Sequence, residues 1–410
     1  MGFSVSVLPR MSLLRAFWWA ASSLVVMIVS VLVGRRGGWS DRPQAAFKGR
    51  KNAVRGLARP LAHASAVTIP SQRVEERSLR TPRWEQLGEL EEYHQLCLGR
   101  LEHFVPVSEP LVLVSEIQRS GGTLLSQLLD SHPECHADPF EIKIGYPRKD
   151  NWPPLDLARP ETCFEALFDS SLLERLRPTA RTRRPDLGRS AFPCLFFPRL
   201  QKAIFDACVA REPIERERDV LDCYFTSYFN AWLDNQNLYS GPKKVVTGFT
   251  PRLAMDPGNL ECFFAAYPDG TLVSLVRDPR GWYASASRYR GKYGDLDAAL
   301  RLWRRSTEAS IEAARRFGER VLVLTYEELV LDTEATMQRL AERLGISMSP
   351  TLLMPTFNGR AIRANSSDPV ERYGILPERA SAYRQSLHAE TIERIVELTG
   401  DLYERAAAVG

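Results

Sequence analysis

Two stretches of this 410-residue chain place arginine, glycine and hydroxyl residues directly after an apolar run. In the first, residues 111–114 are apolar, and leucines at helical spacing follow from residue 124, which predicts a strand, a tight turn and a helix. The turn and the first helical residue are Arg119, Ser120, Gly121, Gly122, Thr123 and Leu124. Backbone N–H groups at a helix start favour an anion, and arginine and hydroxyl groups add donors. These six residues are therefore predicted to bind a phosphate; the alternative is a glycine turn before an ordinary helix.

The second stretch repeats this arrangement about 150 residues later. A β-branched run, residues 271–276, predicts a strand, and Arg277 follows it directly. Pro279 suits the first turn of a helix, and Ser285 comes eight positions after Arg277, two helical turns on. Arg277 and Ser285 are therefore predicted to face one pocket, where the guanidinium pairs with a second phosphate and the hydroxyl donates a hydrogen bond.

Together these stretches resemble the phosphate motifs of sulfotransferases that use 3′-phosphoadenylyl sulfate (PAPS), of the Golgi carbohydrate and bacterial types. The first loop is not a Walker A motif, because it lacks Gly-Lys-Ser/Thr. The resemblance implies that PAPS is the co-substrate, with no metal, and that residues 119–124 hold its 5′-phosphosulfate. It also implies that Arg277 and Ser285 hold the 3′-phosphate and that Arg119 neutralises charge growing on the leaving phosphate.

The resemblance extends to residues further along the chain. Tyr326, in the sequence Tyr-Glu-Glu-Leu, is expected beside the adenine, although a core tyrosine is an equal alternative. A basic segment before the last helix is expected to close the nucleotide pocket, with Arg384 or Arg379 near the 3′-phosphate. The family's helper lysine or histidine is missing after the strand at 243–249, so it is absent or replaced by Arg252.

A carboxylate close to the donor is expected to accept the proton of the acceptor hydroxyl. Similar sulfotransferases have such a carboxylate shortly after a His-Pro pair, here His132-Pro133. Asp138 occupies that position and is the first candidate for the catalytic base, with Glu141 the second and His136 the third. The segment is interpreted as a corner, and the alternative for Asp138 is a cap on a helix or turn.

Composition excludes several other classes of protein. Charged residues make up 25% and apolar residues 44%, as in an ordinary globular enzyme, and the net charge of +4 is too small and diffuse to indicate nucleic-acid binding. The seven cysteines are scattered and form no Cys-x-x-Cys pair, which argues against zinc and leaves any disulfide pairing open. Cys135 and Cys262 lie near predicted core strands and are expected to be buried thiols.

The first 83 residues differ from the rest of the chain. Residues 1–15 form a tail, 16–34 an uncharged apolar run that predicts a transmembrane anchor, and 35–83 a stem rich in Arg, Ala, Pro and Ser. A cleaved leader is the alternative to the anchor. By analogy, the chain is expected to be a single-pass Golgi membrane protein of type II with a lumenal catalytic domain, or an inner-membrane protein if the source is bacterial.

Residues 84–410 are predicted to form one sulfotransferase domain with a loop-rich insertion at about 145–218. The predicted fold is α/β, a doubly wound, mainly parallel sheet resembling that of P-loop nucleotide hydrolases. Long helices are expected at 296–317, 333–344 and 388–407. The predicted function is sulfuryl transfer to a hydroxyl or amine, with a glycan as the leading acceptor. The alternatives are a P-loop-like kinase and a catalytically inactive relative that binds nucleotide or glycan.

Overall fold

The computed structural model describes residues 83–142, 144, 151–169, 195–288, 293–362 and 372–410. The predicted tail and anchor, nearly all of the predicted stem, and a large part of the predicted insertion lie outside these residues. Among the described helices, none has the length and apolar character needed to cross a lipid bilayer.

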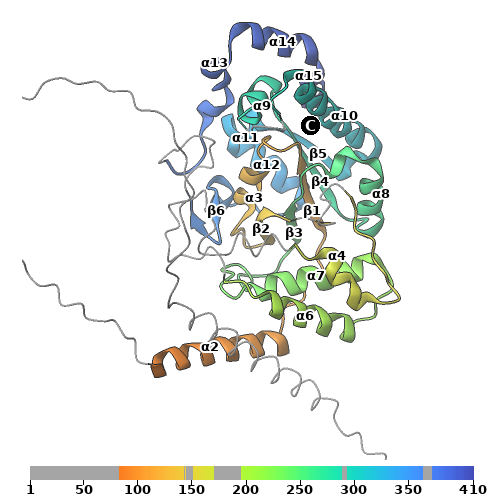
Figure 1. Ribbon diagram of the computed structural model, residues 1–410, viewed down its shortest axis with the longest axis vertical. Helices are drawn as coiled ribbons and strands as arrows, with labels where there is room; N and C mark the ends of the chain where they lie inside the picture. The colour runs from red at the N-terminus through yellow and green to blue at the C-terminus, as the bar shows by residue number, and fades with distance from the viewer. Residues whose placement is uncertain (1–82, 143, 145–150, 170–194, 289–292, 363–371) are drawn as a thin grey trace, which may run out of the picture. The chain divides into compact units, whose positions relative to one another are not determined.

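A five-stranded sheet forms the centre of the domain (Figure 1). All four neighbouring pairs are parallel, and the strand order is β2-β3-β1-β4-β5. The strands are β1 (Leu111–Glu116), β2 (Cys135–Glu141), β3 (Val245–Phe249), β4 (Thr271–Val276) and β5 (Val321–Thr325). The parallel α/β prediction is confirmed, and β1, whose end carries the glycine turn, is the central strand.

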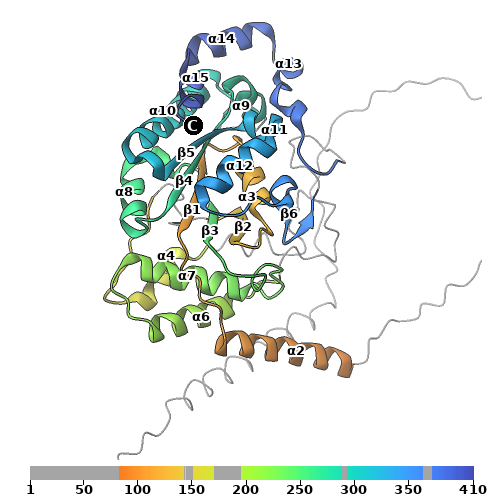
Figure 2. The same cartoon turned by 180° about the vertical axis from the view of Figure 1, so that it is seen from behind.

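Alternate residues of β1 enter two separate hydrophobic layers. Leu111 and Leu113 belong to the larger layer, and Val112 and Val114 belong to the smaller one. This alternation follows from the two-residue period of a strand that is buried on both faces. Helices therefore cover both faces of the sheet, as the two opposite views show (Figure 2).

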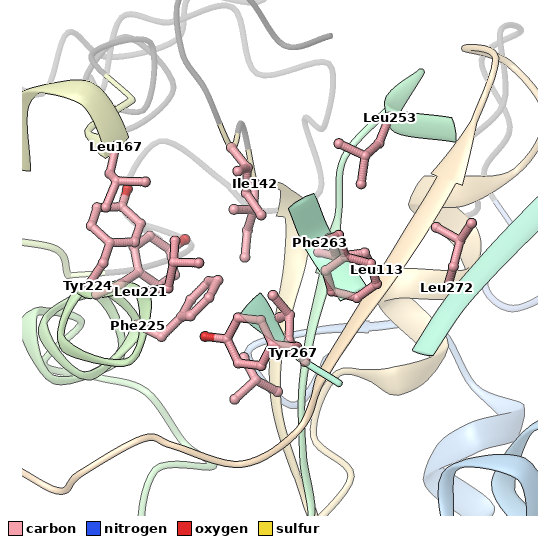
Figure 3. Close-up of a cluster of buried hydrophobic side chains, with 14 of the residues drawn as sticks. Leu113, Ile142, Leu167, Leu221, Tyr224, Phe225, Leu253, Phe263, Tyr267 and Leu272 are labelled. Atoms are coloured by element: carbon pink, nitrogen blue, oxygen red, sulfur yellow. The ribbon is translucent and has the colours of Figure 1, made fainter. Parts of the chain in front are cut away.

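The larger layer contains most of the helices. They are α2 (Arg83–Glu102), α4 (Cys163–Leu167), α6 (Pro198–Arg211), α7 (Glu217–Ala231), α8 (Pro257–Ala266), α9 (Pro279–Ala286), α10 (Leu296–Phe317), α14 (Ala389–Thr399) and α15 (Leu402–Ala407). Figure 3 shows part of this layer, where Leu113 of β1 lies near Leu272 of β4 and Phe263 of α8. The buried hydroxyl of Tyr267 donates to Asp222 Oδ1 at 2.7 Å, so the layer's edge keeps its polar groups paired.

The smaller layer covers the opposite face. It consists of α3 (Gly122–Leu129), α11 (Tyr326–Leu331) and α12 (Thr333–Leu344). The remaining elements include the short helix α13 (Tyr383–Ser386) and a two-stranded hairpin of β6 (Thr356–Phe357) and β7 (Arg360–Ala361), and Phe357 of this hairpin packs into the larger layer. The hairpin was not predicted.

Two predicted elements are wrong. The segment with Asp138 and Pro139 is the strand β2 and not a corner; proline is tolerated because β2 is an edge strand, and the pairing shifts register between Ala137 and Glu141. The helix predicted at 388–407 is two helices, α14 and α15, because Gly400 adopts φ 55° between them.

The cysteines were predicted only in part. Cys208 of α6 and Cys223 of α7 form a disulfide, with their Cα atoms 5.5 Å apart. Cys135 is a buried thiol, as expected, whereas Cys262 is exposed. Cys262 precedes the buried Phe263 on α8, so a one-residue step around the helix turns it towards solvent.

Candidate phosphate-binding site

The turn after β1 has an unusual backbone conformation. Arg119 has φ 83° and Gly121 has φ 113°, both in a region that L-residues seldom occupy. At Gly121 a side chain is also excluded by contact, because an added Cβ would lie 2.7 Å from Cδ2 of Tyr326. An added Cβ on Gly122 would lie 2.5 Å from the ring of Phe249. The two glycines thus allow the turn to approach both rings closely.

The hydroxyl residues of this turn differ in their surroundings. Ser120 is fully buried, and its hydroxyl donates to the carbonyl oxygen of Ile117 at 2.9 Å. Its side chain therefore stabilises the turn itself. Thr123 and Leu124, in the first turn of α3, are half-buried. Gly121 is the N-cap of α3 and has no side chain to accept a hydrogen bond, so the first N–H groups of the helix need other acceptors.

The two arginines of the predicted motifs lie in contact. Arg277 Nη1 donates to the carbonyl oxygen of Arg119 at 3.0 Å, and Arg119 Nε donates to Ser285 Oγ at 3.0 Å. Arg277 directly follows β4, Arg119 lies in the turn after β1, and Ser285 is on α9, so residues from three parts of the fold meet at one point. The structure thus brings Arg119 together with Arg277 and Ser285, of which the spacing had predicted only that Arg277 and Ser285 share one pocket.

Tyr326 packs against the same cluster. The guanidinium of Arg277 lies over its ring at 4.1 Å from the centroid, within the range of a cation–π contact. Burial raises the pKa of Tyr326, and the positive charges of Arg277, Arg379 and Arg119 oppose this rise. One face of the ring is therefore occupied by Arg277, and an adenine base could stack only on the other face.

The end of the chain contributes a backbone contact. Arg277 Nη2 donates to the carbonyl oxygen of Arg379 at 3.5 Å. Arg384 is exposed on α13, and its guanidinium lies 5.9 Å from the ring centre of Tyr383. Of the two basic residues suggested for this segment, Arg379 is therefore the one that the described contacts join to Arg277.

The guanidinium of Arg277 has one N–H that no described residue accepts. Within the described part of the chain, the buried Nε of Arg277 makes no hydrogen bond, although Nη1 and Nη2 of the same guanidinium both donate. Buried donors are nearly always satisfied, and a guanidinium N–H without a partner at the end of a strand is suited to an anionic oxygen.

Two tryptophans that sequence reasoning missed fix the backbones of the two motifs. Trp282 Nε1 donates to the carbonyl oxygen of Gln118 at 2.9 Å, and Trp303 Nε1 donates to the carbonyl oxygen of Arg277 at 3.0 Å. Both indoles are fully buried, so neither has water as an alternative partner. The signal in the sequence was weak, because a tryptophan at helical spacing ordinarily indicates core packing.

A second group of unpredicted contacts surrounds Arg252. Its Nε donates to Gln118 Oε1 at 2.8 Å, its Nη2 donates to the hydroxyl of Tyr293 at 3.2 Å, and that hydroxyl donates to Gln118 Oε1 at 3.0 Å. Arg252 has φ 68°, an uncommon conformation for arginine. This residue, suggested as a replacement for the missing helper, follows β3 and thus lies beside Gln118 in the loop after β1.

The predicted proton acceptors lie on a different strand. Asp138 is 2% exposed, and its Oδ2 accepts a hydrogen bond from the hydroxyl of Tyr228 at 3.0 Å. Glu141 is half-buried at the end of the same strand, and both residues are separated from β1 by β3, roughly 10 Å across the sheet. Their catalytic role stays a prediction.

The geometry defines a class of protein. Two parallel strands, β1 and β4, each pass into a helix through a turn that carries an arginine, at the edge where open α/β sheets bind ligands. The chain is therefore an α/β protein with a two-part anion site. Residues 110–350 match the model of the sulfotransferase family, and the chain belongs to that family and is a sulfotransferase.

Solved structures of other sulfotransferases are similar to this chain at low identity. The sulfotransferase domain of the Synechococcus PCC 7002 olefin synthase is 19% identical, with 73% of this chain and 95% of that chain covered at a TM-score of 0.41. A sulfotransferase from Alicyclobacillus acidocaldarius is 15% identical, with 74% of this chain and 96% of that chain covered at a TM-score of 0.37. Mouse sulfotransferase SULT7A1, complexed with PAP, is 11% identical, with 77% of this chain and 94% of that chain covered at a TM-score of 0.33. A comparison with curated proteins found no match.

Proposed function

We propose that this sulfotransferase moves a sulfuryl group from PAPS to a hydroxyl or amine group of a glycan. The observation that carries the proposal is the contact between Arg277 and Arg119, which joins two arginine-bearing turns from separate strands. A nucleotide with phosphates on both its 3′ and 5′ positions needs two such anion sites, and a site for one phosphate does not.

The donor set fits PAPS. Arg277 would hold the 3′-phosphate through the Nε that lacks a partner among the described residues, and Ser285 would add a hydroxyl. Arg119 and the amides at the start of α3 would hold the 5′-phosphosulfate. When bound, PAPS supplies a sulfuryl group on a good leaving phosphate. The arginines would then stabilise the negative charge that this phosphate gains as the bond to sulfur breaks.

The acceptor must lose a proton during transfer. Asp138 is the proposed base, with Glu141 as the second candidate, because a carboxylate can accept the proton of the acceptor hydroxyl. Both residues are on β2, and only β3 separates this strand from β1. The hydroxyl of Tyr228 would orient the Asp138 carboxylate through its hydrogen bond of 3.0 Å.

We further propose a lumenal location, with residues 16–34 as the anchor and a glycan as acceptor. The disulfide between Cys208 and Cys223 supports an oxidising compartment, since disulfides seldom persist in the cytosol. The predicted anchor and stem agree with this location, and the glycan acceptor rests on analogy with Golgi carbohydrate sulfotransferases.

The experiment is transfer of labelled sulfate from PAPS by the full chain to a panel of glycans, with small phenols and amines as competing acceptors. The proposal expects a labelled glycan, no requirement for magnesium, and loss of at least 90% of the rate, about 1.4 kcal/mol or more, in Arg119→Ala and Arg277→Ala. Labelling only of small molecules would overturn the glycan assignment. Magnesium-dependent turnover of ATP without sulfate transfer would overturn the donor assignment.

A further inference from the structure

The carboxylate of Glu116 lies directly beneath the phosphate-binding loop. Glu116 is the last residue of β1 and is 5% exposed. Its Oε2 accepts a hydrogen bond of 2.5 Å from the N–H of Gly122, the first residue of α3. Its own carbonyl oxygen accepts from the N–H of Arg252 at 2.8 Å, which fixes the backbone that carries it.

This contact engages a group that an anion would be expected to use. The first N–H groups of a helix have no partner within the helix, and they are the donors that hold a phosphate at such a turn. Here one of them already binds a carboxylate from the same chain. In its ionised form Glu116 thus carries a negative charge, like the ligand, and it lies next to the amides that would hold the ligand.

The charged groups around Glu116 come from three elements. Arg119 of the loop and Arg277 at the end of β4 favour its ionised form, as do the amides of Gly122 and Ser120. On α11, the half-buried Glu327 also interacts with Arg277, which lowers the pKa of that carboxyl group. Helix α3 has no charged residue.

Burial outweighs these favourable charges and raises the pKa of Glu116 to about 8. An ionised Glu116 and a bound phosphate would repel each other across a buried site, where charges are poorly screened. The same arginines cannot fully compensate both anions.

We propose that Glu116 couples donor binding to proton uptake: the loop accepts the nucleotide phosphate only together with a proton on the Glu116 carboxyl group. The proton comes from solvent and bonds to a carboxylate oxygen, which neutralises Glu116. The loop then holds the negative charge of the phosphate in place of that of Glu116. This inference rests on the proposed function, since it requires that the loop binds a nucleotide phosphate.

The test is binding of adenosine 3′,5′-bisphosphate to the full chain by calorimetry between pH 7 and pH 9.5. Its phosphates have second pKa values near 6 and stay ionised across this range. We expect affinity to be constant below about pH 8 and to fall up to about tenfold per pH unit above it. At pH 9, titrations in buffers of different ionisation enthalpy should show uptake of close to one proton.

The variant Glu116→Gln keeps an acceptor for the Gly122 amide but cannot titrate. We expect it to equal the wild type at pH 7, to bind about tenfold more tightly at pH 9, and to take up no proton. Asp222→Asn is the matched control, because burial also raises the pKa of the Asp222 carboxyl group, to about 6. Asp222 accepts its hydrogen bond from Tyr267 and not from the phosphate-binding loop. It should retain the wild-type pH dependence.

The possible failures are distinguishable. A wild-type affinity that does not change with pH, or a Glu116→Gln variant that keeps the wild-type dependence, would overturn the inference and leave the donor site intact. Failure of the wild type to bind the nucleotide at pH 7 would overturn the proposed function, and the inference with it.

Discussion

The guanidinium of Arg277 donates to the backbone carbonyl of Arg119 at 3.0 Å, although the two residues are 158 positions apart. The contact makes each arginine part of the other's surroundings. A substitution of Arg277 therefore removes a hydrogen bond from the turn after β1, whether or not a nucleotide is bound.

Trp303 should stabilise the fold through its hydrogen bond to the backbone carbonyl of Arg277. The variant Trp303→Phe removes the indole donor and leaves the Arg277 carbonyl without its partner at 3.0 Å. An unsatisfied buried carbonyl costs about 1–3 kcal/mol, so the free energy of unfolding should fall by that amount. Urea unfolding measures it, and Trp152→Phe, whose indole donates to Glu217 at a part-buried site, is the control. Equal losses in the two variants would contradict the prediction.

The close approach of Gly121 to Tyr326 should make Gly121→Ala damaging. The new methyl would meet the ring at 2.7 Å, in a backbone conformation with φ 113°. We expect a loss of roughly 1–3 kcal/mol in stability, together with weaker nucleotide binding. Gly99→Ala is the matched control: it lies in helix α2 with nothing within 4 Å, and it should stabilise the protein by about 0.5–1 kcal/mol. A harmless Gly121→Ala would contradict the prediction.

Asp130 should make stability depend on pH in mildly acidic solution. Asp130 accepts hydrogen bonds from Thr356 Oγ1 at 2.7 Å and Gly359 N–H at 3.0 Å, which hold the β6–β7 hairpin. Burial raises its pKa to about 6, so the folded state binds the proton more tightly than the unfolded state. The stabilisation is complete below about pH 4 and is lost as pH rises through 6, by roughly 3 kcal/mol in total.

The measurement is urea unfolding of the wild type and Asp130→Asn at pH 4 and pH 7. The variant has no proton to lose, so its stability relative to the wild type should rise by roughly 2–3 kcal/mol between the two pH values. A difference between the two proteins that is the same at both pH values would contradict the assignment.

The disulfide between α6 and α7 should stabilise the domain. It joins Cys208 to Cys223 across a separation of 15 residues, for which loop closure predicts about 3 kcal/mol. Reduction, or the double variant Cys208→Ala/Cys223→Ala, should lower the free energy of unfolding by a similar amount. Alkylation of the native, unreduced protein should label the exposed Cys262 and leave this pair unlabelled. Labelling of Cys208 under these conditions would contradict the pairing.

The sequence predicted the parts of the site that depend on local order along the chain. A buried strand followed by arginine and a helix has one main arrangement, so Arg277 and Ser285 could be placed together from their spacing. The direct contact between Arg277 and Arg119 was not predicted, because the sequence did not show that β1 and β4 are neighbouring strands. These predictions used only rules about single strands and the helices that follow them.

The remaining features depend on tertiary packing. Glu116 occurs where a strand ends and polar residues are common, so nothing in its sequence context indicated a buried carboxylate under the loop. Asp138 and Pro139 resembled a turn because proline is rare in strands, and only the edge position of β2 explains them. The donors Trp282 and Trp303 come from helices whose crossing angles no local pattern specifies.

The most direct test of the account compares two nucleotides that differ only in the 3′-phosphate, adenosine 3′,5′-bisphosphate and adenosine 5′-phosphate. The wild type should bind the bisphosphate about 10- to 100-fold more tightly, as one or two charge-assisted hydrogen bonds allow. Arg277→Ala should remove this preference, Arg119→Ala should weaken both nucleotides, and Arg316→Ala, which alters a surface pair with Glu261, should change neither. An Arg277→Ala variant with the full wild-type preference would contradict the assignment of Arg277 to the 3′-phosphate.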